Sequence, residues 1–490
     1  MIIKKDIDEI QNYFTDAANY KGICDAVYFP ENISDVSTVL KEANSGGNRV
    51  TVSGGGTGIT GSRVPEGGIV LSTERLNRII NISHASIITE PGVVLADLQS
   101  EVESKKLFYP PDPTERNCFI GGTIATNASG AKTLKYGSTR NYVESLQIIL
   151  PEGDLLTLKR NEIFADKLHL VFTSDSGKRF SLNLPEMNMP KTKNASGYFL
   201  KPDMDLVDLF IGSEGTLGVI TQAKLKLLPI PENIISAVIF FDNVENALNF
   251  VMESDNIKHA LAEKSNPDLH PTGIEFFDRR ALDFLRDLFP QIPEGSDAAI
   301  WFEEDSPVNV ESHLNIWHEF IEKHHGDLNN SWIATSPAER EKFKDFRHAV
   351  SWKVNESMAQ KGLRKVGTDT AVPKKNFRQF FAVINDLAEQ SNIDYLVYGH
   401  FGNYHPHLNL LPRNEEEFKR AKELYHQICL KSIELEGTVS AEHGIGKMKH
   451  QYLLDMYGEE VVRGMAVIKK KLDPNLILGI GNIFSLDHLK

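Results

Sequence analysis

The chain has 490 residues, of which 41% are hydrophobic and 24% are charged, so it is expected to fold as a globular protein of two or three domains. Its formal net charge of -14 argues against a general role in nucleic-acid binding, because a polyanion requires a positive surface. Its cysteines, Cys24, Cys118 and Cys429, are too far apart for a Cys-x-x-Cys site, which excludes a cysteine-bound iron–sulfur cluster or zinc ribbon within the chain.

We expect no targeting signal in the N-terminal region. Residues 1–20 lack the apolar core of a signal peptide and predict an amphipathic helix. No run of about 18 apolar residues occurs, so no membrane span is expected. With so few cysteines, these features favour the cytoplasm, and a peripheral position at a membrane stays open.

Residues 22–230 are rich in glycine and in short apolar runs that are typical of strands. We expect a helix at 33–46, whose apolar positions recur three and four residues apart, and strands at 49–54, 68–73, 145–151 and 218–229. Residues 157–192 resemble an insertion, in which 168–185 predicts a hairpin that turns at Ser176-Gly177 and 186–194 predicts a loop. Residues 1–230 therefore predict one α+β domain.

A glycine-rich loop follows the predicted strand at 49–54. Gly56 to Gly61 match the pattern G-x-G-x-x-G, but a dinucleotide-binding turn needs a helix to follow at once. Here the next residues, Ser62 to Ser72, lead through Pro65 into another strand, so we do not expect NAD to bind. The backbone N–H groups of Gly54 to Ser62 can instead surround a diphosphate.

The second half of the chain alternates between strands and helices. We expect strands at 234–241 and 298–304, and helices at 244–254, 309–324, 339–352 and 377–390. This pattern predicts a separate α+β domain at 231–447 that covers the first one. Residues 448–490 predict a helical segment that returns to the first domain.

A group of titratable residues lies near the end of the second domain. Apolar runs at 393–399 and 408–411 predict two strands joined by a tight loop, which would bring His400 and His407 close together. Glu442 and His443 follow further along, between small residues. Two histidines and one carboxylate suit a divalent metal and leave room for a substrate.

Three separated segments carry a resemblance to a known family. They are 53–62 (SGGGTGITGS), 110–156 (beginning PPDPTERNCFIGGT) and 212–221 (GSEGTLGVIT). Together they resemble the FAD-binding domain of the vanillyl-alcohol oxidase and p-cresol methylhydroxylase superfamily, and within it D-lactate dehydrogenase of the cytochrome type, the glycolate oxidase catalytic subunit and D-2-hydroxyglutarate dehydrogenase. The resemblance implies a two-subdomain FAD-binding domain of the p-cresol methylhydroxylase type, an α+β ferredoxin-like substrate or cap domain, and a C-terminal helical segment packed on the FAD domain.

The resemblance also implies which residues hold FAD. The pyrophosphate would be bound by Ser53, Gly54, Gly55, Gly56, Thr57, Gly58, Ile59, Thr60, Gly61 and Ser62. The flavin and its phosphates would be lined by Pro111, Asp112, Thr114, Gly121, Gly122, Thr123, Asn127, Gly130, Tyr136 and Gly137. The adenosine part would be faced by Glu214, Gly215, Gly218 and Ile220. No histidine lies in or beside the loop, and Cys118 stands where noncovalent members carry small residues. We therefore expect FAD to bind noncovalently.

The activity implied by the resemblance is that of an FAD-dependent dehydrogenase. It would oxidise a small D-2-hydroxy acid, similar to D-lactate, to the 2-oxo acid by hydride transfer to flavin N5. His400, His407 and Glu442 would bind a divalent metal, with Zn or Mn fitting best, and His443 would be the base.

The substrate carboxylate would be bound by a cation on the predicted helix at 339–352. Arg347 matches the family arginine that binds it, because a guanidinium pairs with a carboxylate through two hydrogen bonds. Ser351, one helical turn later, stands where some members have threonine and would also line the substrate.

The sequence departs from the family pattern in three places. Asn403 to Pro406 replace Asp-Gly-Asn and an apolar residue, so His405 is either an extra ligand or a hydrogen-bonding neighbour. Gly367 stands where D-2-hydroxyglutarate dehydrogenases have lysine, and Lys365 lies two residues earlier, which argues against a dicarboxylate substrate. At the C-terminus, Gly479 to Asn482 replace Asn-Pro-Gly-Lys.

Two alternatives stay open. One is a metal-independent FAD oxidase or dehydrogenase that acts on another alcohol. The other is a flavin subunit of a larger electron-transfer complex similar to glycolate oxidase. No motif indicates whether a quinone, a cytochrome or an Fe–S protein accepts the electrons, and a homodimer is compatible with the sequence.

Overall fold

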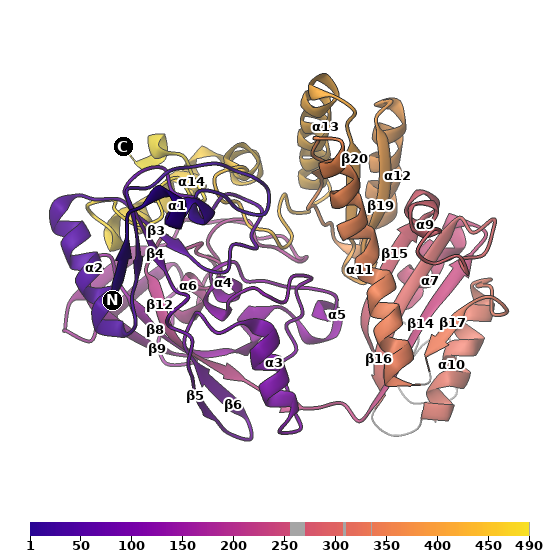
Figure 1. Ribbon diagram of the computed structural model, residues 1–490, viewed down its shortest axis with the longest axis horizontal. Coiled ribbons are helices and arrows are strands. Elements are labelled where there is room, and N and C mark those ends of the chain that lie inside the picture. Colours follow the sequence, from indigo (N-terminus) through magenta and orange to yellow (C-terminus); the bar gives the residue numbers. More distant parts are fainter. Residues whose placement is uncertain (255–269, 307–309, 335, 490) are drawn as a thin grey trace.

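The protein consists of two bodies that lie side by side (Figure 1). The computed structural model describes residues 1–254, 270–306, 310–334 and 336–489. The first body is drawn in indigo to magenta and the second in pink to orange, and the yellow C-terminal segment returns to the first. This arrangement is an α+β architecture, as predicted.

The first body contains two main sheets. The smaller one has the order β1 (Ile2–Lys4), β2 (Ala26–Phe29), β4 (Ile69–Ser72), β3 (Val50–Ser53), and its last three strands are parallel. The larger one is antiparallel, with the order β5 (Ile79–Ile82), β6 (Ser86–Thr89), β12 (Val219–Lys226), β8 (Val143–Ile149), β9 (Leu155–Lys159). Helix α2 (Ile33–Gly46) has the predicted bounds, and its Val39 and Leu40 belong to one apolar cluster with Val50 and Ile149. This helix therefore joins the two sheets.

Shorter elements complete the first body. They are α1 (Ile7–Ile10), η1 (Gln11–Tyr13), α3 (Leu95–Glu103), β7 (Leu107–Phe108), α4 (Ile120–Ala125), α5 (Thr133–Tyr136), η2 (Thr139–Tyr142), β10 (His169–Thr173), β11 (Arg179–Asn183), α6 (Val207–Phe210) and β13 (Leu228–Pro229). Strands β10 and β11 pair antiparallel across Ser176-Gly177, which confirms the predicted hairpin. Residues 186–194 form no helix or strand, also as predicted.

Two predictions for the first body were wrong. Residues 1–20 do not form one amphipathic helix, because Ile2 pairs with Phe29 in the smaller sheet and Asp6 caps only the short helix α1. Helix α1 buries only Ile10, while its Ile7 is 66% exposed, so a long apolar side is missing. The segment expected to be inserted from 157 also begins too early, since Thr157 and Lys159 belong to β9 and pair with β8.

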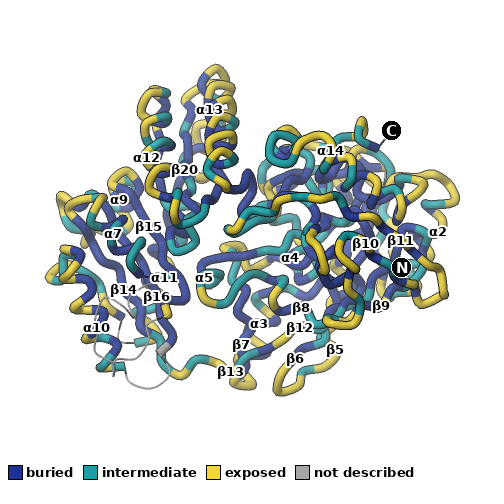
Figure 2. Tube along the Cα trace, turned by 180° about the vertical axis from the view of Figure 1, so that it is seen from behind, coloured by how far each residue is buried: buried dark blue, intermediate teal, exposed yellow. Residues whose placement is uncertain are grey.

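The second body is built on a seven-stranded sheet. Its order is β17 (Trp332–Ala334), β14 (Asn233–Phe241), β16 (Ala298–Ser306), β15 (Pro271–Asp278), β19 (Asp394–His400), β20 (His405–Leu411), β18 (Val366–Gly367). Figure 2 shows β14, β15 and β16 as mostly buried, because helices cover both of their faces.

Alternating side chains of β14 explain the two covered faces. Val238 and Phe240 share a core with helices α9 (Arg279–Leu285) and α11 (Pro337–Gln360). Ile239 and Phe241 face the other way, toward α7 (Val244–Glu253), α10 (Val310–Lys323) and α12 (Lys374–Gln390). The helices and strands predicted for this half are confirmed, except that Asn309, the expected start of α10, lies outside the described residues.

The chain then returns to the first body. Helix α13 (Glu415–Glu434) is followed by α14 (His450–Leu472) and η5 (Leu486–Leu489). Lys469 on α14 donates to the carbonyl of Thr216, and Leu478 forms a parallel bridge with Val50 of β3. Among the described residues, no helix combines the length and apolar character that a membrane span requires.

The two bodies meet through the short helix α5. Lys135 and Tyr136 both bind the carboxylate of Asp305 on β16, and Lys132 lies 3.7 Å from Glu303. Gly273 of β15 lies against the backbone of Ala131, because a Cβ there would be 2.7 Å from the Ala131 carbonyl oxygen. These contacts join the interior strands β15 and β16 of the second sheet to the first body.

Candidate active site

Strands β19 and β20 form a hairpin that brings three histidines together. His400 pairs with His405, and Tyr398 pairs with His407 across the hairpin. The loop between the strands contains Tyr404 in the left-handed region, with a φ of 57°. A side chain is strained there, which explains physically why the family pattern has glycine at this position.

Both predicted histidine ligands have one ring nitrogen fixed by a hydrogen bond. His407 Nδ1 donates to the carbonyl of Thr368 at 3.0 Å, and His400 Nδ1 lies 2.7 Å from the carboxylate of Glu275. A carbonyl or an ionised carboxylate can only accept, so Nδ1 carries a proton in both rings. Burial lowers the pKa of His407, so its ring is neutral and its Nε2 carries a lone pair. Burial also opposes protonation of His400, but the Glu275 carboxylate outweighs it and raises the pKa of that ring. Each Nε2 atom lies 3.4 Å from a different oxygen of Glu442.

A buried aspartate, Asp369, holds the segment that carries Glu442 and His443. Its carboxylate accepts from the backbone N–H groups of Glu442 and His443 at 3.2 and 3.1 Å, from Ser440 Oγ at 2.6 Å and from Lys449 Nζ at 2.8 Å. His443 and Lys449 hold the pKa of Asp369 well below its usual range, although burial opposes this. Asp369 therefore stays charged and fixes the ligand and the expected base in one geometry.

The two remaining histidines differ in access. His443 Nδ1 lies 3.2 Å from Asp369 and its side chain is 28% exposed, whereas His405 is completely buried. Burial lowers the pKa of His443, but the nearby Asp369 carboxylate outweighs this and raises it to about 9. Burial lowers the pKa of His405 well below its usual value, so its ring is neutral. His405 Nε2 lies 3.2 Å from Asp369, as expected for a hydrogen-bonding neighbour. A ring nitrogen of His405 also lies within 4.8 Å of ligand atoms of His400, His407 and Glu442, as expected for an extra metal ligand.

The donor set fits a divalent metal. Ligand atoms of His400, His405, His407 and Glu442 all lie within 4.8 Å of one another. The Nε2 atoms of His400 and His407 both face the Glu442 carboxylate at 3.4 Å, so three potential ligand atoms converge on one place. A second group that fixes the far ring nitrogen is the usual support of metal-binding histidines. The residues present would thus hold Zn or Mn at this place.

The predicted carboxylate-binding arginine lies beside this cluster. Arg347 on α11 is buried, its Nε is 3.6 Å from Glu275, and its Nη1 donates to His348 at 2.8 Å. Among the described residues, Arg347 Nε has no hydrogen-bond partner. Glu275 therefore lies between Arg347 and His400, which links the arginine to the cluster, and Ser351 lies one helical turn further along α11.

The glycine loop has the form expected for an anion-binding site. Gly56 and Gly61 have φ values of 81° and 80°, which require glycine. Asp16 binds the N–H of Gly61 at 2.7 Å, while the N–H groups from Gly54 to Thr60 donate to no group of the described chain. The guanidinium of Arg63 lies against Gly56 and adds positive charge. No helix follows, so the loop is not a dinucleotide-binding turn, as predicted.

Glu214 holds the loop to the C-terminal segments. Its buried carboxylate accepts from Ser62 Oγ at 2.6 Å and from the N–H groups of Ile445 and Gly446 at 2.8 Å. Burial raises its pKa. Glu214 was expected to face the adenosine, and the structure instead gives it partners inside the protein.

The C-terminal Asn482, where the family pattern departs, also reaches the glycine loop. Its side chain donates to the carbonyls of Ser62 and Glu214 at 2.9 Å and accepts from Lys447 at 2.7 Å. An asparagine and a lysine thus lie at the loop even though the motif is changed. Because Lys447 and Glu442 belong to one short segment, the loop and the histidine cluster are neighbours.

The other expected cofactor residues fall into two groups. Gly58 and Gly122 face open space, since a Cβ at either would meet nothing within 4 Å, and Gly54 faces Gly122. By contrast, Cβ atoms at Gly121, Gly130 and Gly218 would collide with Pro91, Asp112 and Ile148, so these glycines are needed for packing within the protein.

Several side chains expected at the cofactor have partners within the protein. Asn127 accepts from Ser138 and Arg140, Tyr136 binds Asp305, and Thr123 donates to Ile120. Pro111 and Ile220 are buried, Asp112, Gly137 and Gly215 are partly buried, and Thr114 is exposed.

Sequence reasoning missed four residues that shape the site: Asp16, Lys193, Glu275 and Asp369. A signal existed for Glu275, because a charged residue interrupts the apolar run of β15 and is buried there. Asp369 was not singled out either, although it lies only two residues after Gly367. Lys193, from the loop at 186–194, forms an ion pair with Glu442 at 2.6 Å, and nothing in its local sequence indicated this.

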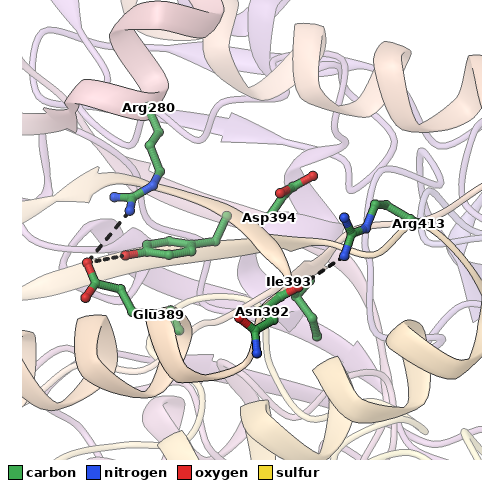
Figure 3. A pocket seen from close by; sticks show the side chains of 8 residues that line it. Arg280, Glu389, Asn392, Ile393, Asp394 and Arg413 are labelled. Carbon is green, nitrogen blue, oxygen red and sulfur yellow. Dashed lines mark hydrogen bonds and ion pairs between the residues drawn. The ribbon is translucent and has the colours of Figure 1, made fainter.

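A separate hollow lies at the edge of the second body (Figure 3). It has a volume of about 520 Å³ and is bordered by Arg280, Glu389, Asp394 and Arg413. Its charged groups have protein partners, since Arg413 pairs with Glu417 and Arg280 lies over the ring of Tyr395. No residue of the histidine cluster lines it, so it is distinct from the candidate active site.

Comparisons with known proteins agree with this picture. Residues 24–159 match the FAD binding domain model, and residues 230–483 match the model for the C-terminal domain of FAD linked oxidases. A glycolate oxidase subunit GlcD from Bacillus subtilis is 31% identical, covering 96% of this chain and 91% of that protein. A D-lactate dehydrogenase from Archaeoglobus fulgidus is 30% identical, covering 93% of this chain and 90% of that protein.

More distant proteins share the fold or most of the length. A D-2-hydroxyglutarate dehydrogenase from Stutzerimonas stutzeri is 27% identical, covering 98% of this chain and 95% of that protein. A solved structure of alkyldihydroxyacetonephosphate synthase superimposes with a TM-score of 0.67 at 15% identity, covering 97% of this chain and 81% of that one. The likeness shows that the two proteins share a fold, and together with the FAD binding domain model it confirms the predicted type of FAD-binding domain. The chain therefore belongs to the FAD-linked oxidases, with an FAD-binding domain of the p-cresol methylhydroxylase type.

Proposed function

We propose that this protein is an FAD-dependent dehydrogenase that oxidises a small D-2-hydroxy acid of lactate size to the 2-oxo acid. Relatives that share nearly its whole length are named as a glycolate oxidase subunit, D-lactate dehydrogenases and D-2-hydroxyglutarate dehydrogenases. All three names describe oxidation of a 2-hydroxy acid. The D configuration is taken from two of these names and from no particular residue.

One observation carries the proposal. The Nε2 atoms of His400 and His407 both point to the Glu442 carboxylate, while their Nδ1 atoms are bound to Glu275 and Thr368. This preorganised set of donors is suited to a divalent metal, which the oxidation of a hydroxyl group can use. An FAD oxidase without a metal would not need it.

In the proposed oxidation, the cofactors and the side chains have different roles. When bound, the flavin accepts a hydride at N5 and the metal makes a hydroxyl group more acidic. His443, whose Nδ1 faces Asp369 at 3.2 Å, is placed to take the hydroxyl proton at Nε2 when its ring is neutral. The Glu442 carboxylate helps to raise the pKa of His443 to about 9, so a cation bound to Glu442 would lower this pKa and favour the neutral ring. Asp369 would stabilise the imidazolium ion that results, as a buried carboxylate does for a catalytic histidine. The substrate thus loses one hydride and one proton and becomes the 2-oxo acid.

Arg347 is the candidate for binding the substrate carboxylate. It is buried, and its Nε lacks a hydrogen-bond partner among the described residues, so it has a free donor to offer to an anion. A charge-assisted hydrogen bond contributes about 1.5–3 kcal/mol, so replacing Arg347 by alanine is expected to raise KM roughly 10- to 100-fold.

Our inference about the size of the substrate depends on residues in and beside strand β18. Gly367 offers no cation for a second carboxylate, and Lys365 instead lies 3.4 Å from Tyr398, whose ring is 5.9 Å from that of His407. We therefore place monocarboxylates ahead of dicarboxylates. Replacing Lys365 by methionine should leave turnover of D-lactate largely unchanged.

Anaerobic stopped-flow measurement of flavin reduction tests the proposal. The purified FAD-loaded protein is mixed separately with D-lactate, L-lactate, glycolate and D-2-hydroxyglutarate. We expect fast reduction by D-lactate and slow reduction by L-lactate. Fast reduction by the L-isomer, or by the dicarboxylate alone, would overturn the assignment.

A further inference from the structure

Lys193 brings a cation from the first body into the histidine cluster. Its Nζ lies 2.6 Å from Glu442 Oε2, and its side chain is only 6% exposed. It belongs to the loop at 186–194, whereas His400 and His407 come from the second body. The contact therefore crosses the boundary between the two bodies at the metal-binding group.

The surroundings of Glu442 Oε2 explain why a cation is held there. The same oxygen lies 3.3 Å from Ser129 Oγ and 3.4 Å from His400 Nε2. Glu442 is buried with two further carboxylates near the histidines, Glu275 and Asp369. Within the part of the chain that the structure describes, no other lysine or arginine pairs with Glu442. Lys193 thus supplies the positive charge that this group of acceptors requires.

A divalent metal and the Lys193 ammonium would compete for the Glu442 carboxylate. Metal–ligand bonds from histidine nitrogen and carboxylate oxygen are about 2.0–2.2 Å long, so a metal bound to His400 and Glu442 would lie directly beside Nζ. Two cations at that separation in a buried site repel strongly. We propose that the Lys193 ammonium occupies the cation position of the metal-free site and that a divalent metal binds Glu442 only by displacing it. This inference rests on the proposed metal site.

The role of such a lysine would be to keep the empty site intact and the metal exchangeable. Without a lysine or arginine beside it, the Glu442 carboxylate would destabilise the metal-free protein. With the Lys193 ammonium beside Glu442, the metal-free protein stays folded until a metal binds. The cost is a lower metal affinity, because the ion pair must break before the metal binds.

Calorimetric metal titration of the FAD-loaded protein tests this inference. The protein is stripped with a chelator and titrated at one pH with Mn²⁺ and, separately, with Zn²⁺. Lys193→Met is expected to bind at least tenfold more tightly than the natural protein, and Lys193→Arg, which keeps the charge, to bind much less tightly than Lys193→Met. Lys191→Met changes an exposed lysine of the same loop and should leave the affinity within about twofold, so it is the matched control.

Thermal unfolding gives a second, independent readout. Metal-free Lys193→Met should unfold at a lower temperature than the natural protein, and saturating metal should raise its unfolding temperature by more. If Lys193→Met does not fold, as judged by circular dichroism and FAD content, Lys193→Gln replaces it.

Two results would contradict the inference in different ways. Equal or weaker metal binding by Lys193→Met, with clear binding by the natural protein, would overturn the competition and leave the metal site standing. Absence of metal binding in the natural protein and in Lys193→Met would overturn the metal site itself.

Discussion

Hydrogen-bond partners decide what each histidine of the candidate site can do. His400 and His407 have Nδ1 bound to protein acceptors, which leaves Nε2 for a ligand. His443 faces Asp369 and is partly exposed, so it is the histidine that a substrate can reach. Identical side chains in one cluster thus serve different purposes because their neighbours differ.

The first prediction concerns His443. His443→Ala should keep metal and FAD but slow flavin reduction by the substrate roughly 10²–10⁴-fold, the usual contribution of a general base. Rapid-mixing absorbance at the flavin band measures this, and metal content measured on the same sample is the control. An unchanged reduction rate would remove His443 from the mechanism.

The second prediction concerns pH and His348. Burial and the neighbouring Arg347 lower the pKa of His348 to about 4. Because this lies below the unfolded value of about 6.5, the unfolded chain binds more protons between pH 6.5 and 4, and acidification through this window lowers the free energy of unfolding.

The matched variant is His348→Gln, whose oxygen can accept from Arg347 Nη1 and does not titrate. It should lose less stability than the natural protein between pH 6.5 and 4, by on the order of 1–3 kcal/mol. Urea unfolding at a series of pH values measures the difference. Parallel curves for the two proteins would mean that His348 gains its proton without cost.

Single residues were predictable where a motif names them and unpredictable where long-range folding places them. His400, His407, Glu442 and His443 come together as the sequence predicted. Lys193 meets Glu442 only because the loop at 186–194 folds onto the second body, which no local pattern encodes. Glu214 was assigned to the cofactor, yet its carboxylate binds Ser62, Ile445 and Gly446.

At the scale of elements, the segment 440–447 joins the two parts of the candidate site. Near its start are Glu442 and His443, whose backbone N–H groups donate to the Asp369 carboxylate. At its end, the N–H of Lys447 donates to the carbonyl of Thr60 in the glycine loop. Helix α14 follows at once and is held to the first body by Lys469. Correct docking of this helix therefore positions both the proposed metal ligands and the glycine loop.

The third prediction tests that docking. Lys469 and Asp473 form a completely buried ion pair on α14, and Lys469 also donates to the carbonyls of Thr216 and Leu478. Lys469→Met leaves Asp473 buried without its cation and should lower the free energy of unfolding by about 3–5 kcal/mol. Urea unfolding of the FAD-loaded protein measures this.

Two further variants make the result specific. Lys471→Met, at an exposed position of the same helix, should change stability by less than about 0.5 kcal/mol. Lys469→Met combined with Asp473→Asn should recover part of the loss, because the unpaired charge is gone. A loss of under 1 kcal/mol in Lys469→Met would show that the pair does not hold the helix.

Helices and strands were predicted well where apolar periodicity is strong. They were predicted poorly where pairing with another strand decides the local structure. Helix α2 and the hairpin β10–β11 have the predicted positions, because their patterns are local. Residues 1–20 were misjudged as one helix, since Ile2–Lys4 pair with β2 instead and only Ile7–Ile10 are helical. Strand β9 was taken for the start of an insertion, since its partner β8 is a separate sequence run.

At the scale of the whole molecule, the candidate site combines residues from both bodies. The first provides the glycine loop, Ser129 and Lys193, and the second provides His400, His407 and Arg347. Alternation of strands and helices predicted the two bodies and the returning C-terminal segment. The side chains that join them, such as Tyr136 with Asp305, could not be read from the sequence because they depend on how the bodies dock.

The fourth prediction concerns the attachment of the cofactor. The glycine loop offers N–H donors to a pyrophosphate but contains no histidine, and Cys118 is buried with its pKa raised by burial to about 12, so its thiol is unreactive. Purified protein should be yellow and release intact FAD into the supernatant on acid precipitation. Flavin that remains with the precipitate would disprove noncovalent binding.

Metal dependence of flavin reduction tests the central claim most directly. The FAD-loaded protein is stripped of metal with a chelator, and flavin reduction by D-lactate is followed anaerobically before stripping, after stripping, and after Zn²⁺ or Mn²⁺ is restored. We predict that stripping removes most of the reduction rate, that one of the two metals restores it, and that His407→Ala does not recover when metal is added. Reduction by the stripped protein as fast as by the untreated protein would contradict the claim that His400, His407 and Glu442 form a metal site that serves oxidation.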